Sequence, residues 1–249
     1  MSLAVLDGRV AIVTGGGSGV GHGIALGLSD HGAAVAVVGA GADAVAAEIV
    51  AGGRRAAAAC CAFNDGAETT RAFAQMAGAL GPIDLVVHAA SLPAALVQSP
   101  LIDLDEDSWD ACGEGVLRSG LWVAQAARIQ LTGRGGAIVF VIPTIAMTGA
   151  AGLVPYATAM EGQRALVRSA ARQWGAQGIR VNCVAPPLET MSDHGPAADE
   201  APPLNTSALG RPPDGRSDIA PVIAMLAGDS GHFVTGTTIP VDGGVWMAP

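Results

Sequence analysis

Short runs of β-branched and other apolar residues alternate with longer alanine-rich segments from one end of the chain to the other. Continuous apolar runs bounded by glycine, proline and polar residues are typical of strands that are buried on both faces of a parallel sheet. The segments between the runs are long enough for the helices that cover such a sheet. The pattern therefore predicts an α/β protein with a helix in most of the connections.

The apolar runs also give the approximate positions of the elements. Strands are expected near residues 9–14, 34–38, 56–61, 84–88, 136–142, 179–184 and 237–241. Long helices are expected near residues 105–132 and 155–177. No repeat or shift in composition divides the chain, so residues 1–249 are expected to form one domain, large enough to bury a sizeable core.

One segment, at about residues 187–216, interrupts the alternation and is rich in Pro, Asp and Gly. Loops of this length in compact domains are usually lids or binding loops. The composition agrees with a flexible loop that binds substrate and equally with a surface loop that has no part in binding. Asp193 and His194 lie in this segment and are either cleft residues or solvated ones.

The charge of the chain excludes one class of partner. The net charge is −9 and the pI is about 4.8, whereas a nucleic-acid interface needs clustered Lys and Arg. The chain contains no lysine, since all 13 Lys+Arg side chains are arginine. No lysine can therefore act here as a proton shuttle, Schiff base or phosphate anchor.

The cysteines and the termini favour a cytoplasmic protein without a metal. None of the four cysteines forms a Cys-x-x-Cys pair, so we expect buried free thiols and no zinc site. The first residues lack the pattern of a signal peptide. Residues 135–160 carry no charge, but Pro143 and Pro155 interrupt them, which indicates a strand, a loop and a helix start rather than a membrane span.

A glycine-rich loop follows the first predicted strand and opens a helix. The stretch "VAIVTGGGSGVGHGIA" places Gly15, Gly19 and Gly21 in the pattern Gly-x-x-x-Gly-x-Gly. Glycines at such a position allow a tight turn and let backbone N–H groups approach a pyrophosphate at the helix N-terminus. A loop that serves packing alone is the alternative. The context of strand, loop and helix favours a dinucleotide site.

Three stretches together resemble the short-chain dehydrogenase/reductase family over nearly the whole chain. These are the loop "TGGGSGVG", the strand "GIRVNCVAP", and the C-terminal "LGRPPDGRSDIAPVIAMLAGDSGHFVTGTTIPVDGG". The resemblance implies a Rossmann-type, doubly wound, parallel sheet of seven strands in the order 3-2-1-4-5-6-7. It also implies oligomers whose faces are built by the two long helices.

The family's catalytic set is Asn, Ser, Tyr and Lys, and the resemblance carries one member over intact. Tyr156, the only tyrosine, stands at the tyrosine position. Met160 replaces the lysine, Pro143 the serine and Val116 the asparagine. Thr144, next to Pro143, offers a hydroxyl at a shifted position. The branch of divergent enoyl reductases does not fit better, because Ala159 and Gln163 stand where it has methionine and lysine.

Two further side chains are candidates for a role beside Tyr156. Arg164 lies two helical turns beyond it and can bring a positive charge nearby, or can face solvent or an interface. His88, at the end of a predicted strand, can form a general acid/base pair with Tyr156, or can be a histidine that the fold itself satisfies. Glu114 and Arg118 have the spacing of a surface ion pair.

The resemblance implies fewer coenzyme contacts than the family usually has. Gly39 and Ala40 replace the acidic residue of NAD users and the arginine of NADP users, so neither NAD nor NADP is specified. Ala62 replaces the aspartate after the third strand, and residues 88–91 replace Asn-Asn-Ala-Gly. The retained candidate contacts are Thr14, Gly15, Ser18, Gly19, Gly21, Ala90 and Thr190.

Three functions agree with these residues. The first is a non-redox descendant, expected as the inactive subunit of a complex with an active relative. The second is an atypical NAD(P)(H)-dependent oxidoreductase of a ketone or alcohol that uses Tyr156. The third is an acid/base enzyme, such as a dehydratase, isomerase or cyclase, in the old cleft. The missing Ser, Lys and Asn favour the first. Expected partners are a second copy of the chain or an active relative, and a small-molecule ligand.

Overall fold

The protein is described by a computed structural model in which residues 5–90, 98–191 and 207–247 are placed. Its centre is one sheet of seven parallel strands in the order β3-β2-β1-β4-β5-β6-β7. The strands are β1 (Val10–Thr14), β2 (Ala34–Val38), β3 (Ala56–Ala59), β4 (Leu85–His88), β5 (Gly136–Val141), β6 (Ile179–Ala185) and β7 (Thr238–Pro240). Every strand overlaps a predicted one, and the predicted order is confirmed.

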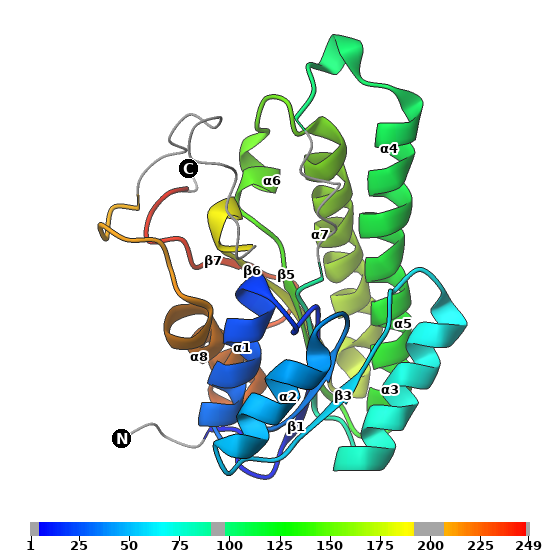
Figure 1. Ribbon diagram of the computed structural model, residues 1–249, viewed down its shortest axis with the longest axis vertical. Helices are drawn as coiled ribbons and strands as arrows, with labels where there is room; N and C mark the ends of the chain where they lie inside the picture. The colour runs from blue at the N-terminus through cyan, green and yellow to red at the C-terminus, as the bar shows by residue number, and fades with distance from the viewer. Residues whose placement is uncertain (1–4, 91–97, 192–206, 248–249) are drawn as a thin grey trace.

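Helices cover both faces of the sheet. They are α1 (Gly19–Asp30), α2 (Ala42–Ala51), α3 (Gly66–Leu80), α4 (Glu106–Cys112), α5 (Ser119–Leu131), α6 (Ile145–Thr148), α7 (Val154–Trp174) and α8 (Ala220–Ala227). Figure 1 shows α1, α2 and α8 on one side of the sheet and α3, α5 and α7 on the other. None of the helices in the described ranges is both long and apolar enough to cross a membrane.

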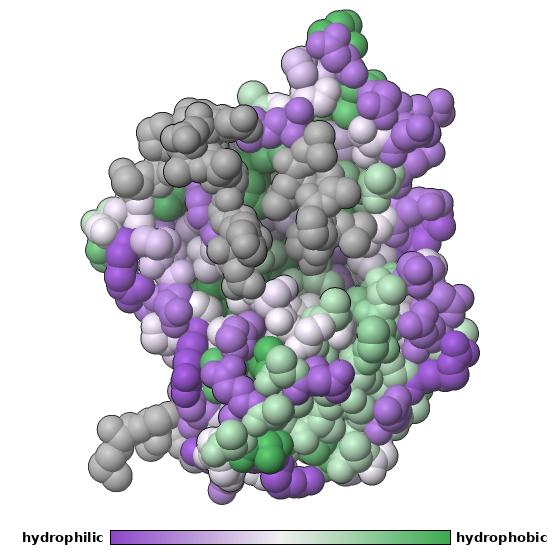
Figure 2. Space-filling model, viewed as in Figure 1, coloured by the Kyte–Doolittle hydropathy of each residue, from purple (hydrophilic) through white to green (hydrophobic). Residues whose placement is uncertain are grey.

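The burial of the strands explains why the sequence folds this way. Strands β1, β2 and β4 are buried at every position, as their continuous Val, Ile and Ala runs require in a doubly covered sheet. The edge strand β3 consists of four alanines and is only partly buried. Figure 2 shows a moderately hydrophobic surface over this edge, with hydrophilic residues along the rim of the molecule. One expectation about burial is wrong, because Cys60, just after β3, is exposed whereas the other cysteines are buried.

The first predicted long helix is continuous, but its middle is a π-helix. Residues Gly113–Arg118 form this segment, named η3, between α4 and α5. Two neighbouring donors supplement the backbone bonds at Val116: the Gln163 amide donates to the Val116 carbonyl oxygen at 2.7 Å, and the Ser119 hydroxyl donates to it at 2.8 Å. Close contact with α7 holds the segment, since a Cβ at Gly162 of α7 would lie 2.8 Å from Leu117 Cδ1. π-segments of this kind are frequent near functional sites.

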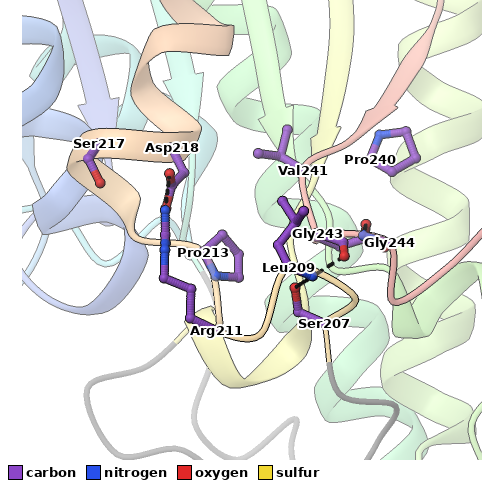
Figure 3. A pocket seen from close by; sticks show the side chains of 11 residues that line it. Ser207, Leu209, Arg211, Pro213, Ser217, Asp218, Pro240, Val241, Gly243 and Gly244 are labelled. Carbon is purple, nitrogen blue, oxygen red and sulfur yellow. Dashed lines mark hydrogen bonds and ion pairs between the residues drawn. The ribbon is translucent and has the colours of Figure 1, made fainter.

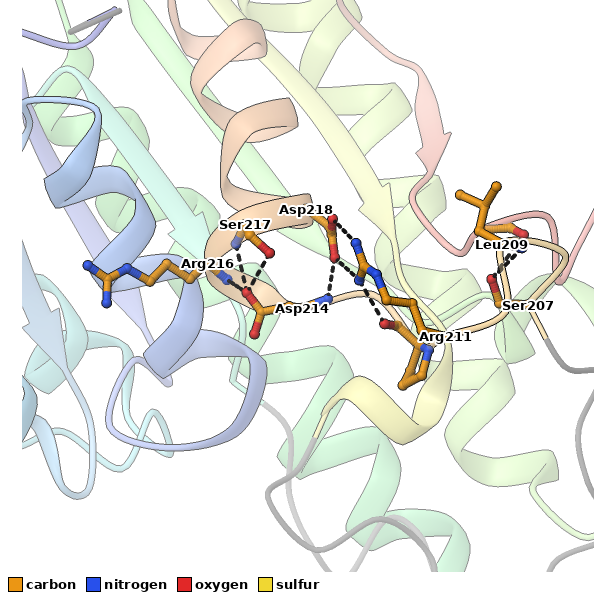
Figure 4. Close-up of polar contacts among 9 residues, drawn as sticks. Ser207, Leu209, Arg211, Asp214, Arg216, Ser217 and Asp218 are labelled. Carbon is orange, nitrogen blue, oxygen red and sulfur yellow. Dashed lines mark hydrogen bonds and ion pairs between the residues drawn. The ribbon is translucent and has the colours of Figure 1, made fainter. Parts of the chain in front are cut away.

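The described residues of the segment at 187–216 are held by contacts with their surroundings. A short 3₁₀ turn covers Leu188–Met191, and Asp193 and His194 lie outside the described residues. Figure 4 shows Asp214 accepting hydrogen bonds from the backbone N–H groups of Arg216 and Ser217, at 3.0 and 2.7 Å, as the N-cap of a second π-helical segment. These hydrogen bonds therefore fix the backbone of the segment, residues 207–218, that leads into α8.

Two arginines fix the end of this segment. Arg211 contacts both carboxylate oxygens of Asp218, at 2.6 and 2.8 Å, and these bonds lower the pKa of Asp218 to about 2. Arg216 makes a similar two-pronged contact with Asp30 at the end of α1. Between this segment and residues 240–244 lies an open cavity of about 390 Å³, in whose wall Arg211 and Asp218 stand (Figure 3).

Candidate active site

The glycine loop between β1 and α1 is built from backbone contacts that only glycine permits. A Cβ at Gly17 would lie 1.8 Å from the Ala40 carbonyl oxygen, and one at Gly21 would lie 2.2 Å from the Gly15 carbonyl oxygen. Gly15 and Gly19 have φ angles of +70° and +53°, in the left-handed region. The loop therefore folds tightly across the carboxyl end of β1 and leads into the N-terminus of α1, the arrangement that favours a bound phosphate.

A cavity of about 370 Å³ opens beside this loop. It lies at the carboxyl ends of the central strands, where the strand order reverses between β1 and β4. Open α/β sheets bind their ligands at this switch point. The residues lining the cavity carry no charged side chain; they are Gly15, Ser18, Gly39, Ala40, Cys61, Ala62, Phe63, Ala89, Ala90, Gly115, Ser119 and Met191.

Three of the predicted coenzyme contacts lie in this wall and two in a neighbouring one. Gly15, Ser18 and Ala90 line the first cavity. Gly19 and Thr190 line a second cavity of about 410 Å³ on the other side of the N-terminus of α1. The Thr190 hydroxyl is buried and has no hydrogen-bond partner among the described residues. A buried hydroxyl without a partner is costly, so a polar ligand group at this point would be stabilised.

Thr14 lies close to the same sites, but its side chain points into the protein. It is fully buried, and its hydroxyl is 2.8 Å from Nδ1 of His88 on the adjacent strand. The register of the sheet produces this contact, because Thr14 and His88 are paired across β1 and β4. Gly21 acts by its close packing against Gly15.

His88 is enclosed by the core. Its side chain is buried, its ring meets Phe140 edge-on at 5.1 Å, and its Nε2 has no partner among the described residues. Burial lowers the pKa of His88 to about 4, so the imidazole is neutral at pH 7. The contact with Thr14 gives His88 a structural role. The pairing of His88 with Tyr156 in catalysis stays a prediction.

The buried histidine makes stability depend on pH. Because the folded pKa of about 4 lies below the ordinary 6.5, the unfolded chain binds more protons between these values, and stability is lost as pH falls through this window. His88→Asn removes the titrating group and retains a side chain that can bond to Thr14. Between pH 7 and pH 5, the wild type should lose about 2 kcal/mol more unfolding free energy than His88→Asn.

Urea unfolding at both pH values measures this difference. The carboxylates are common to both proteins, so their titration cancels in the comparison. Equal losses in the two proteins would show that His88 is not buried as a neutral group.

The catalytic candidates meet on α7 and the segments around it. Tyr156 and Met160 lie one turn apart, and both side chains are fully enclosed, at 0% exposure. Pro143 and Thr144 follow β5, where the Thr144 N–H donates to the Pro186 carbonyl oxygen at 2.8 Å and the side chain is buried. The structure thus places Thr144 at the start of α6, one residue beyond the proline.

Arg164 brings little free positive charge to this region. Its guanidinium lies 3.2 Å from the Glu161 carboxylate, so the pair is close to neutral. Its Nε is buried without a hydrogen-bond partner in the described chain. The expected surface pair of Glu114 and Arg118 is confirmed at 3.0 Å. Among residues 5–90, 98–191 and 207–247, no group of three or more His, Cys, Asp or Glu side chains is arranged to hold a metal.

The sequence did not single out several residues of the first cavity as candidates. Phe63, Cys61, Ser119 and Met191 line it. Phe63 is also the only non-glycine residue with a positive φ, at 56°, in the part of the chain that the structure describes. One feature of the sequence could have identified Phe63 as a candidate. It follows a predicted strand and lies next to Ala62, which replaces the family's aspartate.

Comparison with known proteins identifies the family of the chain. A family model described as enoyl-(acyl carrier protein) reductase matches residues 15–246. The cis-4-hydroxycyclohexanecarboxylate dehydrogenase of Sinomonas cyclohexanicum is 35% identical over 244 residues, which are 95% of this chain and 96% of that protein. A 3-oxoacyl-(acyl-carrier-protein) reductase of Staphylococcus aureus is 32% identical over 96% of this chain and 98% of its own. The chain belongs to the short-chain dehydrogenase/reductase family.

Solved structures give the same result. A short-chain dehydrogenase from Burkholderia cenocepacia in complex with NADP has a TM-score of 0.86 and 32% identity, and the match covers 96% of this chain and 98% of that one. A blue fluorescent protein from a metagenomic library, in complex with NADPH, has a TM-score of 0.84 and 32% identity, with coverages of 97% and 99%.

The prediction of a non-redox descendant, or of an inactive subunit, is wrong. Relatives that match nearly the whole chain are named as dehydrogenases and reductases, and none of those compared above is named as an inactive subunit. That prediction gave full weight to the replacements at Pro143, Met160 and Val116. The resemblance gives these positions a supporting part in proton transfer, whereas the tyrosine to which it assigns the proton exchange and the glycine loop are both retained.

Proposed function

We propose that this protein is an NAD(P)(H)-dependent oxidoreductase that interconverts a hydroxyl and a carbonyl group, with Tyr156 exchanging the proton. The observation that carries this proposal is the glycine loop, whose tight backbone packing at the switch point suits a pyrophosphate. The names of the relatives and the NADP and NADPH in two similar structures support it.

Different residues of this chain bind the coenzyme and transfer the proton. Backbone N–H groups of residues 16–18 would hold the pyrophosphate at the N-terminus of α1, and the unpartnered Thr190 hydroxyl would bind a polar group of the nicotinamide. When bound, the nicotinamide supplies or accepts the hydride. In reduction, the Tyr156 hydroxyl gives its proton to the carbonyl oxygen as the carbon receives the hydride; in oxidation, Tyr156 takes the proton back.

Tyr156 performs this transfer without a lysine. Met160 offers no charge to stabilise the phenolate, and Arg164 is neutralised by Glu161. The enclosed position of Tyr156 removes water from its hydroxyl, and a substrate reaches it only when the surrounding wall opens. Because no charge beside the phenol stabilises the phenolate, oxidation, which needs the phenolate, is favoured at alkaline pH. We further propose that the protein acts as one domain and as an oligomer of identical chains.

Calorimetric titration with NADH and NADPH, followed by turnover assays, tests the proposal. We expect at least one nucleotide to bind with a Kd of about 1–100 µM, which corresponds to roughly −5 to −8 kcal/mol. We also expect coenzyme-dependent oxidation of secondary alcohols that becomes faster as pH rises. The absence of heat with millimolar concentrations of both nucleotides would contradict the proposed function.

A further inference from the structure

We propose that Gln163 is a positioning residue of the proposed reaction. Its buried amide joins α7, the helix that carries Tyr156, to the π-helical segment η3 beside the glycine-loop cavity. This inference rests on the proposed function and names a residue that keeps the proposed proton donor in place relative to that cavity.

Gln163 shares a helix face with the proposed proton donor. Tyr156, Met160 and Gln163 are spaced at i, i+4 and i+7, so they lie on one side of α7. All three side chains are buried, and Gln163 is only 1% exposed. Glutamine is mostly found at the surface, because a buried amide is costly unless it is hydrogen-bonded. The bonds of the Gln163 amide therefore have to offset this cost.

The acceptor of the Gln163 amide lies on a different element. Nε2 donates to the Val116 carbonyl oxygen at 2.7 Å, across 47 positions of the chain. Val116 lies in the π-helical turn, where the regular hydrogen-bond pattern of the helix is interrupted. The Ser119 hydroxyl donates to the same oxygen at 2.8 Å, but it is only three positions away in the same stretch. Of these two side-chain bonds, only the one from Gln163 connects the stretch to α7.

Glycines on both sides make room for this connection. Figure 1 shows α7 beside α4 and α5, between which the π-helical segment lies. A Cβ at Gly120, at the start of α5, would lie 2.7 Å from Nε2 and 2.8 Å from Cδ of Gln163. A Cβ at Gly162 would lie 2.8 Å from Cδ1 of Leu117 in the segment. The side chains therefore interlock between the helices, and an added Cβ at Gly120 would push the amide away from Val116.

The contact links two parts of the proposed site. Gly115 and Ser119, on either side of Val116, line the cavity beside the glycine loop. Tyr156 lies about two helical turns before Gln163 on the opposite partner of the contact, α7. Proton and hydride transfer need the phenol and the coenzyme at a fixed separation, and a misplacement of about 1 Å can lower the rate by about 10²-fold. Loss of the Gln163 bond should therefore lower the rate of the reaction more than the binding of the coenzyme.

Gln163→Met tests this role, because methionine has a similar length and no donor. We expect kcat to fall by about 10- to 100-fold, while the Kd of the nucleotide stays within about threefold of the wild type. Gly120→Ala should have the same effect by displacing the amide. Because both changes act on one contact, the double variant should lose no more than about threefold beyond the less active single variant.

Asn182→Leu is the matched control. Asn182 on β6 is fully buried, its amide donates to the Val234 carbonyl oxygen at 2.9 Å, and it accepts from the Thr237 N–H at 3.2 Å. Gln163→Met should lower Tm by about 2–10 °C, and Asn182→Leu should lower it at least as much. Asn182→Leu should nevertheless keep kcat within about twofold of the wild type, measured well below both melting temperatures.

The outcomes separate this inference from the proposed function. A folded Gln163→Met with wild-type kcat would overturn the inference alone, and so would an equal fall of kcat in Asn182→Leu. Losses that multiply in the double variant would show that Gly120 and Gln163 do not act through one contact. If Gln163→Met does not fold, kcat of Gly120→Ala decides. If the wild type binds neither nucleotide, the proposed function fails and the inference fails with it.

Discussion

Met160→Lys is expected to raise the rate of oxidation at neutral pH by about 10- to 100-fold. Position 160 lies one helical turn after Tyr156, so an ammonium there would reach the phenol hydroxyl. A nearby positive charge stabilises the phenolate, the form that accepts the proton from the alcohol. The rising limb of the pH–rate profile should therefore move to lower pH.

The expected gain is smaller than the full contribution of a general base because Met160→Lys restores only one of the three replaced catalytic positions, while Pro143 and Val116 stay as they are. The variant should also be less stable, because a charge at a fully buried position loses its hydration.

Met160→Leu provides the matched control. It keeps the apolar volume, should cost less than about 1.5 kcal/mol of unfolding free energy, and should leave the pH profile in place. Initial rates across the pH range and thermal melting of the three proteins measure both effects. A folded Met160→Lys with the rate and the pH profile of Met160→Leu would contradict the expected effect of a charge on the Tyr156 phenol.

Tyr156→Phe is expected to lower kcat by about 10²-fold or more, while the Kd of the nucleotide stays within about twofold of the wild type. The substitution removes the hydroxyl that we propose as the proton donor and keeps the ring that fills the core, where Tyr156 is fully buried. Loss of turnover with retained binding is the result that a role in chemistry requires and that a role in packing alone does not produce.

The phenol can also be observed directly. Tyr156 is the only tyrosine, so the phenolate absorbance that appears on alkaline titration reports on this one residue. In Met160→Lys this absorbance should appear at lower pH than in the wild type, in parallel with the kinetic profile. Wild-type kcat in Tyr156→Phe would exclude Tyr156 as the proton donor and would turn attention to Thr144 and His88.

The fold was predictable because its signal is local. Apolar runs bounded by glycine and proline mark all seven strands within a few residues, and the strand order followed from the resemblance in the motifs. The glycine loop was predictable for the same reason. Its positive φ angles and close backbone contacts depend on the absence of side chains at particular positions, which a sequence states directly.

The site was predictable only in part, because its properties depend on residues far apart in the chain. The sequence named His88 and Thr14 separately, but the register of β1 and β4 brings them to 2.8 Å and makes His88 a buried neutral group. The sequence placed Gln163 at an unmatched position, but packing of α7 on the π-segment directs its amide to Val116.

The sequence by itself therefore determined the sheet, the coenzyme loop and the identity of the replaced catalytic residues. Counting replacements suggested a non-redox protein, and the relatives of the chain contradicted this. Only the tertiary structure decided that the cavity beside the glycine loop is lined without charge and that Phe63 faces it with a positive φ. The physical reason is that a motif records which side chains are present, whereas the charge, burial and partners of a site arise when distant segments pack together.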